Sequence, residues 1–360
     1  MFYRAIGVMS GSSLDGLDLA FVEFEETGGK WNYAITASAC YEYDPEWIEK
    51  LKTAITLNAY DYMLLHTAYG KYIGQKINLF INEHNLQHRV QIIGSHGHTT
   101  FHAPHLGMTH QLGDGAAIAA TTNINVVSDL RNMDVALGGQ GAPIVPVGEK
   151  LLFNDVDMLL NIGGIANISF NANEYVAFDI CPANRVLNIL ANESGKAYDE
   201  NGNIAAGGKI NNELLAALNA LDFYAKPYPK SLANSFGVET VYPLIKKYNL
   251  NNEDTLRTYT EHVASQISLQ VINSTFKIEN SKLLVTGGGA HNTFLLERLK
   301  ALLPDVDFII PEAELINYKE ALIMALLGIL RWREENTVLA SVTGAKRSSI
   351  GGAVWMGQEA

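Results

Sequence analysis

The sequence predicts an α/β protein of two similar domains that face a central cleft. Three observations favour this fold class. Apolar strands alternate with amphipathic helices along 360 residues, a length that exceeds one ordinary domain. Apolar residues make up 48% of the chain, which is enough for two large cores. A strand, a glycine-rich turn and a second strand occur twice, about half a chain apart, as IGVMSGSSLDGLDLAFVEF and as MLLNIGGIANISF.

The individual elements follow from the period of the apolar residues. Strands are expected at 4–9, 17–24, 33–42, 91–94 and 124–127, and again at 157–161, 165–170, 175–178, 282–286 and 306–310. Helices are expected at 45–57, 61–84, 182–193, 211–221, 254–276, 291–302 and 317–334. Glycine and proline interrupt the pattern in SDLRNMDVALGGQGAP, so we place the domain boundary there. The predicted domains are 1–130 with 340–360, and 131–339.

The composition excludes several classes of function. A net charge of −12 leaves no basic face for a nucleic acid partner. The two cysteines, Cys40 and Cys181, are too few for a disulfide framework and favour a reducing compartment. No apolar run reaches the roughly 18 residues that a membrane helix requires, and the N-terminus has no signal-peptide pattern. We therefore expect a cytoplasmic protein that binds no membrane.

The first glycine-rich turn carries more polar groups than a hairpin needs. Its glycines permit close backbone approach, and successive N–H groups in such a turn form a concavity that binds anions. Asp15 and Asp18 can order a metal ion or its waters. An ordinary Asx turn uses the same residue types, so both interpretations stand. The glycine, serine and aspartate residues of this turn are Gly11, Ser12, Ser13, Asp15, Gly16 and Asp18.

Two further glycine turns follow apolar strands. NIGGIANISF contains Asn161, Gly163, Gly164 and Asn167, and LLVTGGGAHNTFLLERL contains Gly287, Gly288 and Gly289 before a predicted helix. Glycine turns and helix N-termini suit phosphates or a flat nucleotide base. Neither the dinucleotide fingerprint nor a phosphate-binding loop with the Gly-Lys-Ser/Thr signature is present.

Asp179 closes the predicted strand EYVAFDI and precedes Pro182 and a helix. A carboxylate at the end of an apolar strand can face the space between two domains and serve as a general base. The alternative is a helix N-cap or a turn residue. The neighbouring Cys181 is either a reactive thiol or, more simply, a small buried side chain.

The segment GSHGHTTFHAPHLGMTH holds five of the ten histidines. His96 and His98 have strand spacing and share one face, but no nearby cysteine or carboxylate completes a zinc site. A loop that lines a sugar pocket fits these residues better. Downstream, Arg131 can pair with a substrate carboxylate or form a structural bridge to Asp134, and the sequence does not separate these roles.

Eight segments occur in the order typical of one enzyme family. They are MSGSSLDGLD, SHGHT, DLRNMDVALGGQGAP, NIGGIAN, FDICPAN, VTGGGAHN, KEALIMALLG and SVTGA, and the resemblance that they carry covers nearly the whole chain, from Gly7 to Gly344. Together they resemble the anhydro-N-acetylmuramic acid kinases, which belong to the superfamily of sugar kinases, Hsp70 and actin. The resemblance implies two ribonuclease-H-like domains with ATP between them, and it implies a homodimer.

The resemblance also implies an activity and a set of residues. Such enzymes take 1,6-anhydro-N-acetylmuramic acid, ATP and water, open the anhydro bridge and leave a phosphate on O6, as part of peptidoglycan recycling. Asp179 would be the base that activates water. Ser95, His96, His98, Arg131 and Glu320 would contact the sugar. ATP would contact Gly11, Ser12, Ser13, Leu14, Asp15, Gly16, Leu17, Asp18, Gly163, Gly164, Gly287, Gly288 and Gly289, with Mg²⁺ held through water by Asp15 or Asp18.

The chain departs from the family pattern just after the base. The family reads FDTGPGN followed shortly by Asp, whereas this sequence reads FDICPANRVLN. Ile180, Cys181 and Ala183 replace Thr, Gly and Gly, and Asn188 replaces the acid. Two alternatives to the kinase therefore remain at this point: a catalytically impaired relative that binds ATP or sugar, and a kinase of another sugar.

Overall fold

The computed structural model describes residues 1–358 except 12–13, 172–174, 229, 234 and 275–278. The chain forms two compact units, Met1–Asn154 with Tyr318–Ala360, and Asp155–Asn317. Both boundaries differ from the expected 130/131 and 339/340. Residues 131–154 and 318–339 pack within the first unit, where Thr343 donates a 2.7 Å hydrogen bond to Asp134 and Lys319 forms an ion pair with Glu149.

The first unit is built on a sheet with the strand order β12-β6-β4-β1-β2-β3, and β5 pairs with β4. β1 is antiparallel to β2 and parallel to β4, β2 is antiparallel to β3, and β4 is parallel to β6. The strands are β1 (Phe2–Ser10), β2 (Leu17–Thr27), β3 (Lys30–Tyr41), β4 (Ile92–Ala103), β5 (Met108–Leu112), β6 (Asn125–Ser128) and β12 (Ala353–Trp355).

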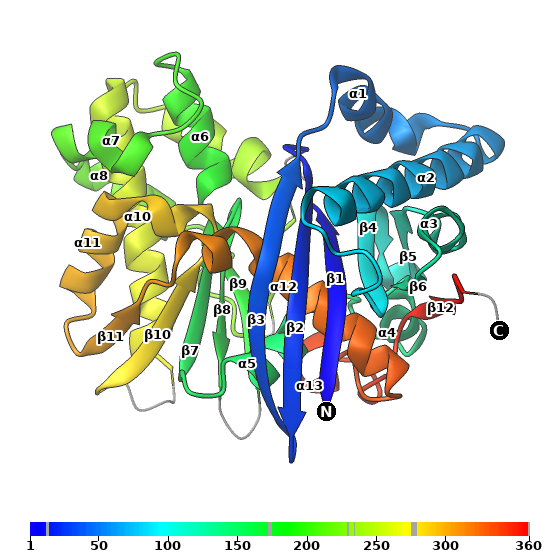
Figure 1. Cartoon of the computed structure of the whole chain (residues 1–360). Helices are drawn as coiled ribbons and strands as arrows, with labels where there is room; N and C mark the ends of the chain where they lie inside the picture. Colours follow the sequence, from blue (N-terminus) through cyan, green and yellow to red (C-terminus); the bar gives the residue numbers. More distant parts are fainter. Residues whose placement is uncertain (12–13, 172–174, 229, 234, 275–278, 359–360) are drawn as a thin grey trace. The chain divides into compact units, whose positions relative to one another are not determined.

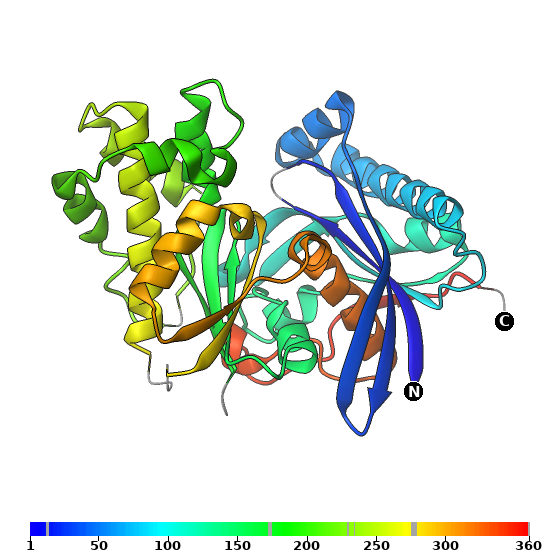
Figure 2. The same ribbon diagram turned by 60° about the vertical axis from the view of Figure 1, so that its left-hand side comes forward.

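Helix α2 (Ala59–Glu83) covers one face of this sheet, as Figures 1 and 2 show. Its buried stripe, including Tyr69, Ile73 and Phe80, packs against Ile6 and Phe21 of the sheet in one apolar cluster. The other helices of this unit are α1 (Pro45–Thr53), η1 (Ala54–Thr56), η2 (Pro104–Leu106), α3 (Gly115–Thr122), α4 (Asn132–Ala136), α5 (Pro146–Leu152) and α13 (Ala340–Thr343).

Helix α12 (Ala313–Trp332) lies against the same sheet through a pair of glycines. Gly7 of β1 and Gly94 of β4 are partners in the parallel register. A Cβ atom on Gly7 would lie 1.7 Å from the carbonyl oxygen of Ala321, and one on Gly94 would lie 2.0 Å from that of Met324. The backbone of α12 therefore contacts the strands directly, which fixes Glu320 on this unit relative to the ends of β1 and β4.

The second unit repeats the central arrangement of the first. Its sheet order is β11-β10-β7-β8-β9, with β7 antiparallel to β8, β8 antiparallel to β9, and β7, β10 and β11 parallel. The strands are β7 (Met158–Ile162), β8 (Ile165–Phe170), β9 (Val176–Pro182), β10 (Ser281–Thr286) and β11 (Val306–Ile309). This is the order β6-β4-β1-β2-β3 of the first unit, so the predicted α/β fold of two ribonuclease-H-like domains is confirmed.

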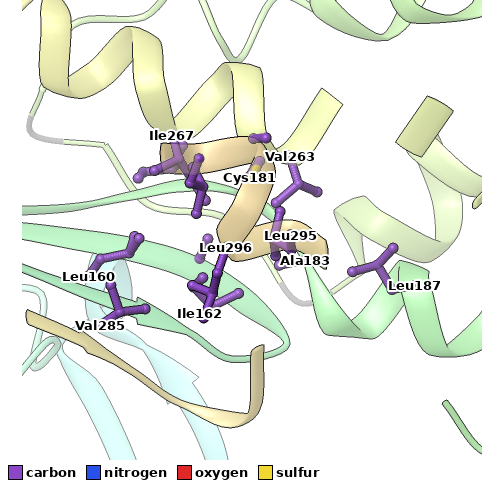
Figure 3. Packing of buried hydrophobic residues seen from close by; sticks show 14 of the residues in the cluster. Leu160, Ile162, Cys181, Ala183, Leu187, Val263, Ile267, Val285, Leu295 and Leu296 are labelled. Atoms are coloured by element: carbon purple, nitrogen blue, oxygen red, sulfur yellow. The ribbon is translucent and has the colours of Figure 1, made fainter. Parts of the chain in front are cut away.

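Helices of the second unit cover an apolar core on one face of this sheet, part of which Figure 3 shows. Figure 2 shows α10 and α11 lying together, consistent with their contacts. The helices are α6 (Asn184–Asn192), η3 (Glu200–Gly202), α7 (Asn203–Gly207), α8 (Asn212–Asn219), the π-helical turn η4 (Gly237–Val241), α9 (Tyr242–Lys246), α10 (Asn252–Ile272), η5 (Gly288–His291) and α11 (Thr293–Leu302). No helix within the described ranges is both long enough and apolar enough to cross a membrane.

Candidate functional site

The first glycine turn joins β1 to β2 in the first unit. Ser12 and Ser13 lie outside the described residues, and the side chain of Leu17 is fully buried, so only its backbone can meet a ligand. Leu14 has a φ of +58°, the left-handed conformation that tight turns use. A Cβ on Gly16 would lie 2.5 Å from the sulfur of Cys40, so close packing against β3 requires glycine here.

Asp18 follows this turn as the second residue of β2. Burial, with a smaller contribution from the negative charges of Asp15 and Glu320, raises the pKa of its carboxyl to about 6, although a hydrogen bond from the Cys40 thiol opposes the shift. Asp15 and Glu320 therefore both act electrostatically on Asp18 within the first unit. Carboxylates that share one region in this way suit a hydrated cation.

His98 belongs to a chain of hydrogen bonds inside the first unit. Its Nδ1 lies 3.0 Å from the hydroxyl of Ser10, the last residue of β1. Tyr43 donates to the same hydroxyl at 2.8 Å, and its own oxygen lies 2.6 Å from that of Tyr69. Nearby on β4, the hydroxyl of Ser95 is buried and has no hydrogen-bond partner among the described residues. The hydrogen bond between Ser10 and His98 thus connects the end of β1 to β4.

The guanidinium of Arg131 is held by one hydrogen bond to β4 and one to the backbone of Gly141. Its Nε donates to His96 Nε2 at 2.9 Å, and its Nη1 donates to the carbonyl oxygen of Gly141 at 3.0 Å. The alternative of a bridge to Asp134 is wrong, because that carboxylate accepts hydrogen bonds from Gly141 N and from the hydroxyl of Thr343. Burial lowers the pKa of Arg131 to about 10, where the guanidinium is still charged at neutral pH.

Glu320 is next in sequence to Lys319 of α12, which forms a buried ion pair with Glu149. Lys319 Nζ lies 2.7 Å from Glu149 Oε1, and both side chains are at most 5% exposed. Burial raises the pKa of the Glu320 carboxyl, and the positive charges of Lys319 and Arg131 act in the opposite direction. Within the first unit, the charge of Glu320 therefore acts on both Arg131 and Asp18.

Asp179 lies in the second unit, on β9, at a β-bulge. Asn167 of β8 faces Asp179, and Ala166 faces Cys181, so Ile180 is the extra residue. Bulges of this kind re-aim side chains at functional sites. The N-cap alternative for Asp179 is wrong, since Ala183 occupies the N-cap position of α6.

A short strap, residues 230–232, fixes the carboxyl of Asp179. The N–H of Leu232 donates to Asp179 Oδ2 at 2.8 Å, and the N–H of Asp179 donates to the carbonyl oxygen of Lys230 at 3.1 Å. Burial raises the pKa of the Asp179 carboxyl, and the bond from Leu232 lowers it. One carboxyl oxygen is therefore anchored, and the other is available to take a proton.

The departures from the family pattern point mainly into the core. Ile180, Cys181 and Ala183 are fully buried in the apolar cluster behind β9, and Figure 3 shows Cys181 and Ala183 within it. Burial also raises the pKa of the Cys181 thiol well above its usual range, which leaves it unreactive. Three of the four changes thus alter packing behind Asp179, and the fourth, Asn188, lines a cavity described below.

The second and third glycine turns meet at the end of the second sheet. Gly287 has a φ of +78°, and a Cβ there would lie 2.6 Å from Asn161 Oδ1. The carbonyl oxygens of Gly163 and Gly164 accept hydrogen bonds from the first N–H groups of the α6 segment. The two turns are therefore locked to each other and to α6.

A cavity of about 430 Å³ opens beside these turns, entirely within the second unit. Its size is within the range of small-molecule sites. Gly288 and Gly289 were predicted to contact a ligand here, and the other lining residues were not predicted. The cavity is lined by Asn184, Leu187, Asn188, Tyr198, Asp199, Asn201, Gly288, Gly289, His291 and Asn292. Amide side chains dominate, and a purine base offers the mixed donors and acceptors that amides match.

Within the described residues, no group of three or more histidine, cysteine, aspartate or glutamate side chains could hold a metal ion. A histidine-based metal site is therefore not supported. Magnesium is usually held in kinases by one or two carboxylates together with phosphate oxygens and waters, so Asp15 and Asp18 fit that ion without such a cluster.

Comparison with known proteins identifies close relatives. The family model for anhydro-N-acetylmuramic acid kinase matches residues 3–357. The anhydro-N-acetylmuramic acid kinase of Pasteurella multocida is 36% identical over 99% of this chain and 97% of its own. That of Aliivibrio fischeri is 37% identical over 84% of each chain. Among solved structures, component A of the (R)-2-hydroxyglutaryl-CoA dehydratase of Acidaminococcus fermentans has a TM-score of 0.47 at 15% identity, over 91% of this chain and 97% of that one.

Proposed function

Because the chain belongs to the anhydro-N-acetylmuramic acid kinase family, we propose that it opens 1,6-anhydro-N-acetylmuramic acid with water and transfers the γ-phosphoryl group of ATP to O6. The product is N-acetylmuramic acid 6-phosphate, an intermediate of peptidoglycan recycling. The observation that carries the proposal is the match of the family model over residues 3–357, which includes every candidate site residue.

Asp179 is the base in this proposal. With Oδ2 anchored by Leu232, Oδ1 accepts a proton from water as the water oxygen bonds to C1 of the sugar. The C1–O6 bond breaks, and O6 bonds to the γ-phosphorus while ADP leaves. The proton remains on Asp179 until solvent removes it. A positioned base contributes about 10²–10⁴-fold to such a step.

The glycine turns hold the nucleotide. Backbone N–H groups around Gly11 and Leu14–Asp18 contact the phosphates, and the cavity beside Gly288 and Gly289 takes the nucleoside. Mg²⁺, when bound, neutralises charge on the phosphate oxygens. Asp15 and Asp18 are the residues that would hold its waters.

The sugar is bound by the first unit. Arg131 pairs with the lactyl carboxylate of the sugar, since a guanidinium matches a carboxylate with two parallel hydrogen bonds. Glu320 accepts from sugar hydroxyls, and Ser95 and His98 supply hydrogen bonds from β4. The buried Ser95 hydroxyl, which lacks a partner among the described residues, supports a role in ligand binding. We further propose a cytoplasmic homodimer, on the strength of the family resemblance.

The proposal is tested by incubating the purified protein with ATP, Mg²⁺ and the anhydro sugar. Sugar-dependent ADP release, together with a phosphorylated sugar whose anhydro bridge is open, is the expected result. ADP release at the same rate without the sugar, and no sugar phosphate, would exclude the proposal in favour of an impaired relative. Turnover of a different hexose in a parallel panel would instead identify a kinase of another sugar.

A further inference from the structure

His96 has both ring nitrogens occupied within the first unit. Nδ1 lies 2.8 Å from the carbonyl oxygen of Gly97, and Nε2 lies 2.9 Å from Arg131 Nε. A carbonyl oxygen only accepts, so Nδ1 carries the hydrogen, and a guanidinium Nε only donates, so Nε2 carries the lone pair. The ring is therefore neutral with a defined tautomer. It is 3% exposed and has no polar atom left for a ligand.

The same contacts fix the guanidinium of Arg131. Its Nε–H is directed at His96 and one Nη1–H at Gly141, which leaves the Nη2 group without an acceptor among the residues that the structure describes. Glu320 influences this guanidinium electrostatically, but no ion pair within 4.0 Å joins the two side chains in the described parts of the chain. The Nη2 group of Arg131 therefore has a fixed orientation, and no carboxylate among the described residues pairs with it.

The backbone at Gly97 supports this arrangement independently. Gly97 has a φ of +71°, and a Cβ there would lie 2.3 Å from the carbonyl oxygen of Leu112 on β5. Only glycine fits this conformation next to β5. The carbonyl that sets the tautomer of His96 is therefore held by the pairing of β4 with β5.

We propose that His96 is a positioning residue for the sugar carboxylate and does not itself contact the substrate. Its Nε2 lone pair orients Arg131 so that the guanidinium can bind the lactyl group. This inference rests on the proposed function, because it assigns the role of Arg131 to the same site. It replaces the expected sugar contact of His96, whereas His98, whose Nε2 has no hydrogen bond within the described residues, keeps the role of a ligand contact.

Two substitutions at His96 separate positioning from packing. The amide oxygen of glutamine reaches the place of Nε2 and can accept from Arg131, whereas asparagine is one carbon shorter and cannot. His96→Asn should weaken binding of 1,6-anhydro-N-acetylmuramic acid about tenfold to a hundredfold, the range for losing a hydrogen bond to a charged group. His96→Gln should remain within about threefold of the parent protein. His105→Asn, at an exposed histidine of the same hairpin, is the matched control.

A sugar that lacks the lactyl group tests whether the effect of His96→Asn depends on the sugar carboxylate. Titration calorimetry with 1,6-anhydro-N-acetylglucosamine, which has the same ring without the lactyl group, should show no more than about a twofold change in His96→Asn. In an Arg131→Lys background, which lacks the Nε–H donor, the same change should have almost no further effect on the muramic sugar. Equal loss for both sugars, or additive losses with Arg131→Lys, would overturn the proposal in favour of a packing role.

The tautomer provides a test that does not depend on turnover. In protein labelled with ¹⁵N-histidine, nuclear magnetic resonance at neutral pH should show His96 with the hydrogen on Nδ1, and Arg131→Met should perturb Nε2. A hydrogen on Nε2 would overturn the inference. If the parent protein phosphorylates no anhydro sugar but shows the expected tautomer, the proposed function fails while the coupling of His96 to Arg131 stands.

Discussion

The backbone N–H of Leu232 donates a hydrogen bond of 2.8 Å to Oδ2 of Asp179. Leu232 is 53 residues away along the chain from the carboxylate that it holds. The bond assigns different roles to the two carboxyl oxygens, because an oxygen that accepts from a fixed N–H stays in place while the other exchanges a proton. This relationship leads to predictions about rate and about pH.

Replacing Asp179 by asparagine should lower the rate of sugar phosphorylation at least a hundredfold, because the amide cannot accept a proton from water. Asparagine preserves the size of the side chain and can still accept the bond from Leu232. Nucleotide binding, measured by calorimetry with a non-hydrolysable ATP analogue, should change little. An unaffected turnover number would show that another group is the base.

Replacing Leu232 by proline should move the acidic limb of the pH–rate profile to higher pH. Proline has no N–H, so the carboxylate form of Asp179 loses a stabilising hydrogen bond and the pKa of the carboxyl rises further. The base works only when deprotonated, so activity is lost at a higher pH than in the parent protein. Leu232→Ala retains the N–H and is the control. A profile that shifts equally in both variants would argue against the bond.

Much of the fold can be predicted from the sequence. The two strand–turn–strand repeats correspond to β1–β2 and β7–β8. They could be predicted because strands that are buried on both faces are almost continuously apolar in sequence. Among the α-helices and strands of the described residues, α3, α4, α5, α7, α9, α13, β5 and β12 were not predicted, and three of them show why. Helix α3 reads GAAIAATT and has no amphipathic period, and β12 has three residues. Strand β5 lies in the histidine-rich segment, whose polar residues obscure the strand pattern.

The candidate site residues were proposed from their side chains, whereas the backbone contacts around them have no signature in the sequence. Asp179 stands out in the sequence because it follows an apolar run, although in the structure β9 continues past it to Pro182. The N–H of Leu232 has no signature that distinguishes it from other amides. The contact of His96 with Arg131 joins residues 35 apart in sequence and depends on the parallel pairing of β4 and β6. The cavity in the second unit likewise arises from segments that meet only in the folded chain.

Replacing Gly287 by alanine should destabilise the second unit and weaken nucleotide binding. The residue has a φ of +78°, and the new methyl group would lie 2.6 Å from Asn161 Oδ1 and 2.8 Å from the carbonyl oxygen of Ile162. Strain of this kind is worth about 1–3 kcal/mol. At Gly288, the nearest atom to an added methyl group is 3.5 Å away, so Gly288→Ala should leave the midpoint of urea unfolding almost unchanged. Equal losses in the two variants would contradict the argument.

Replacing Lys319 by methionine should destabilise the protein by about 3–5 kcal/mol, since the carboxylate of Glu149 would lose its cationic partner in a buried place. The double variant Glu149→Gln with Lys319→Met should recover much of this loss, because neither residue is then charged. Denaturant unfolding of the four proteins in the cycle provides the measurement. If the single and double variants are equally unstable, the ion pair is not the source of the effect.

The raised pKa of Asp18 makes stability depend on pH. Its pKa is about 6 in the folded protein and 3.8 in a model peptide, so the folded state binds more protons than the unfolded state between these values. Stability therefore falls as the pH rises from about 4 to about 6, and the loss is complete above that range. Asp18→Asn does not titrate and should exceed the parent protein in stability at pH 7 by on the order of 2–3 kcal/mol. Below pH 4 this advantage should disappear.

This gain in stability should accompany a loss of activity, because the carboxylate that is unfavourable to bury is the one proposed to order Mg²⁺ beside the phosphates. Urea unfolding of Asp18→Asn and the parent protein at pH 4, 5, 6 and 7 measures the first effect, and the Mg²⁺ dependence of sugar phosphorylation measures the second. Glu25→Gln, at an exposed carboxylate on the same strand, is the control. A constant difference in stability across this pH range would show that Asp18 titrates normally, and the electrostatic link between Asp15, Asp18 and Glu320 would have to be abandoned.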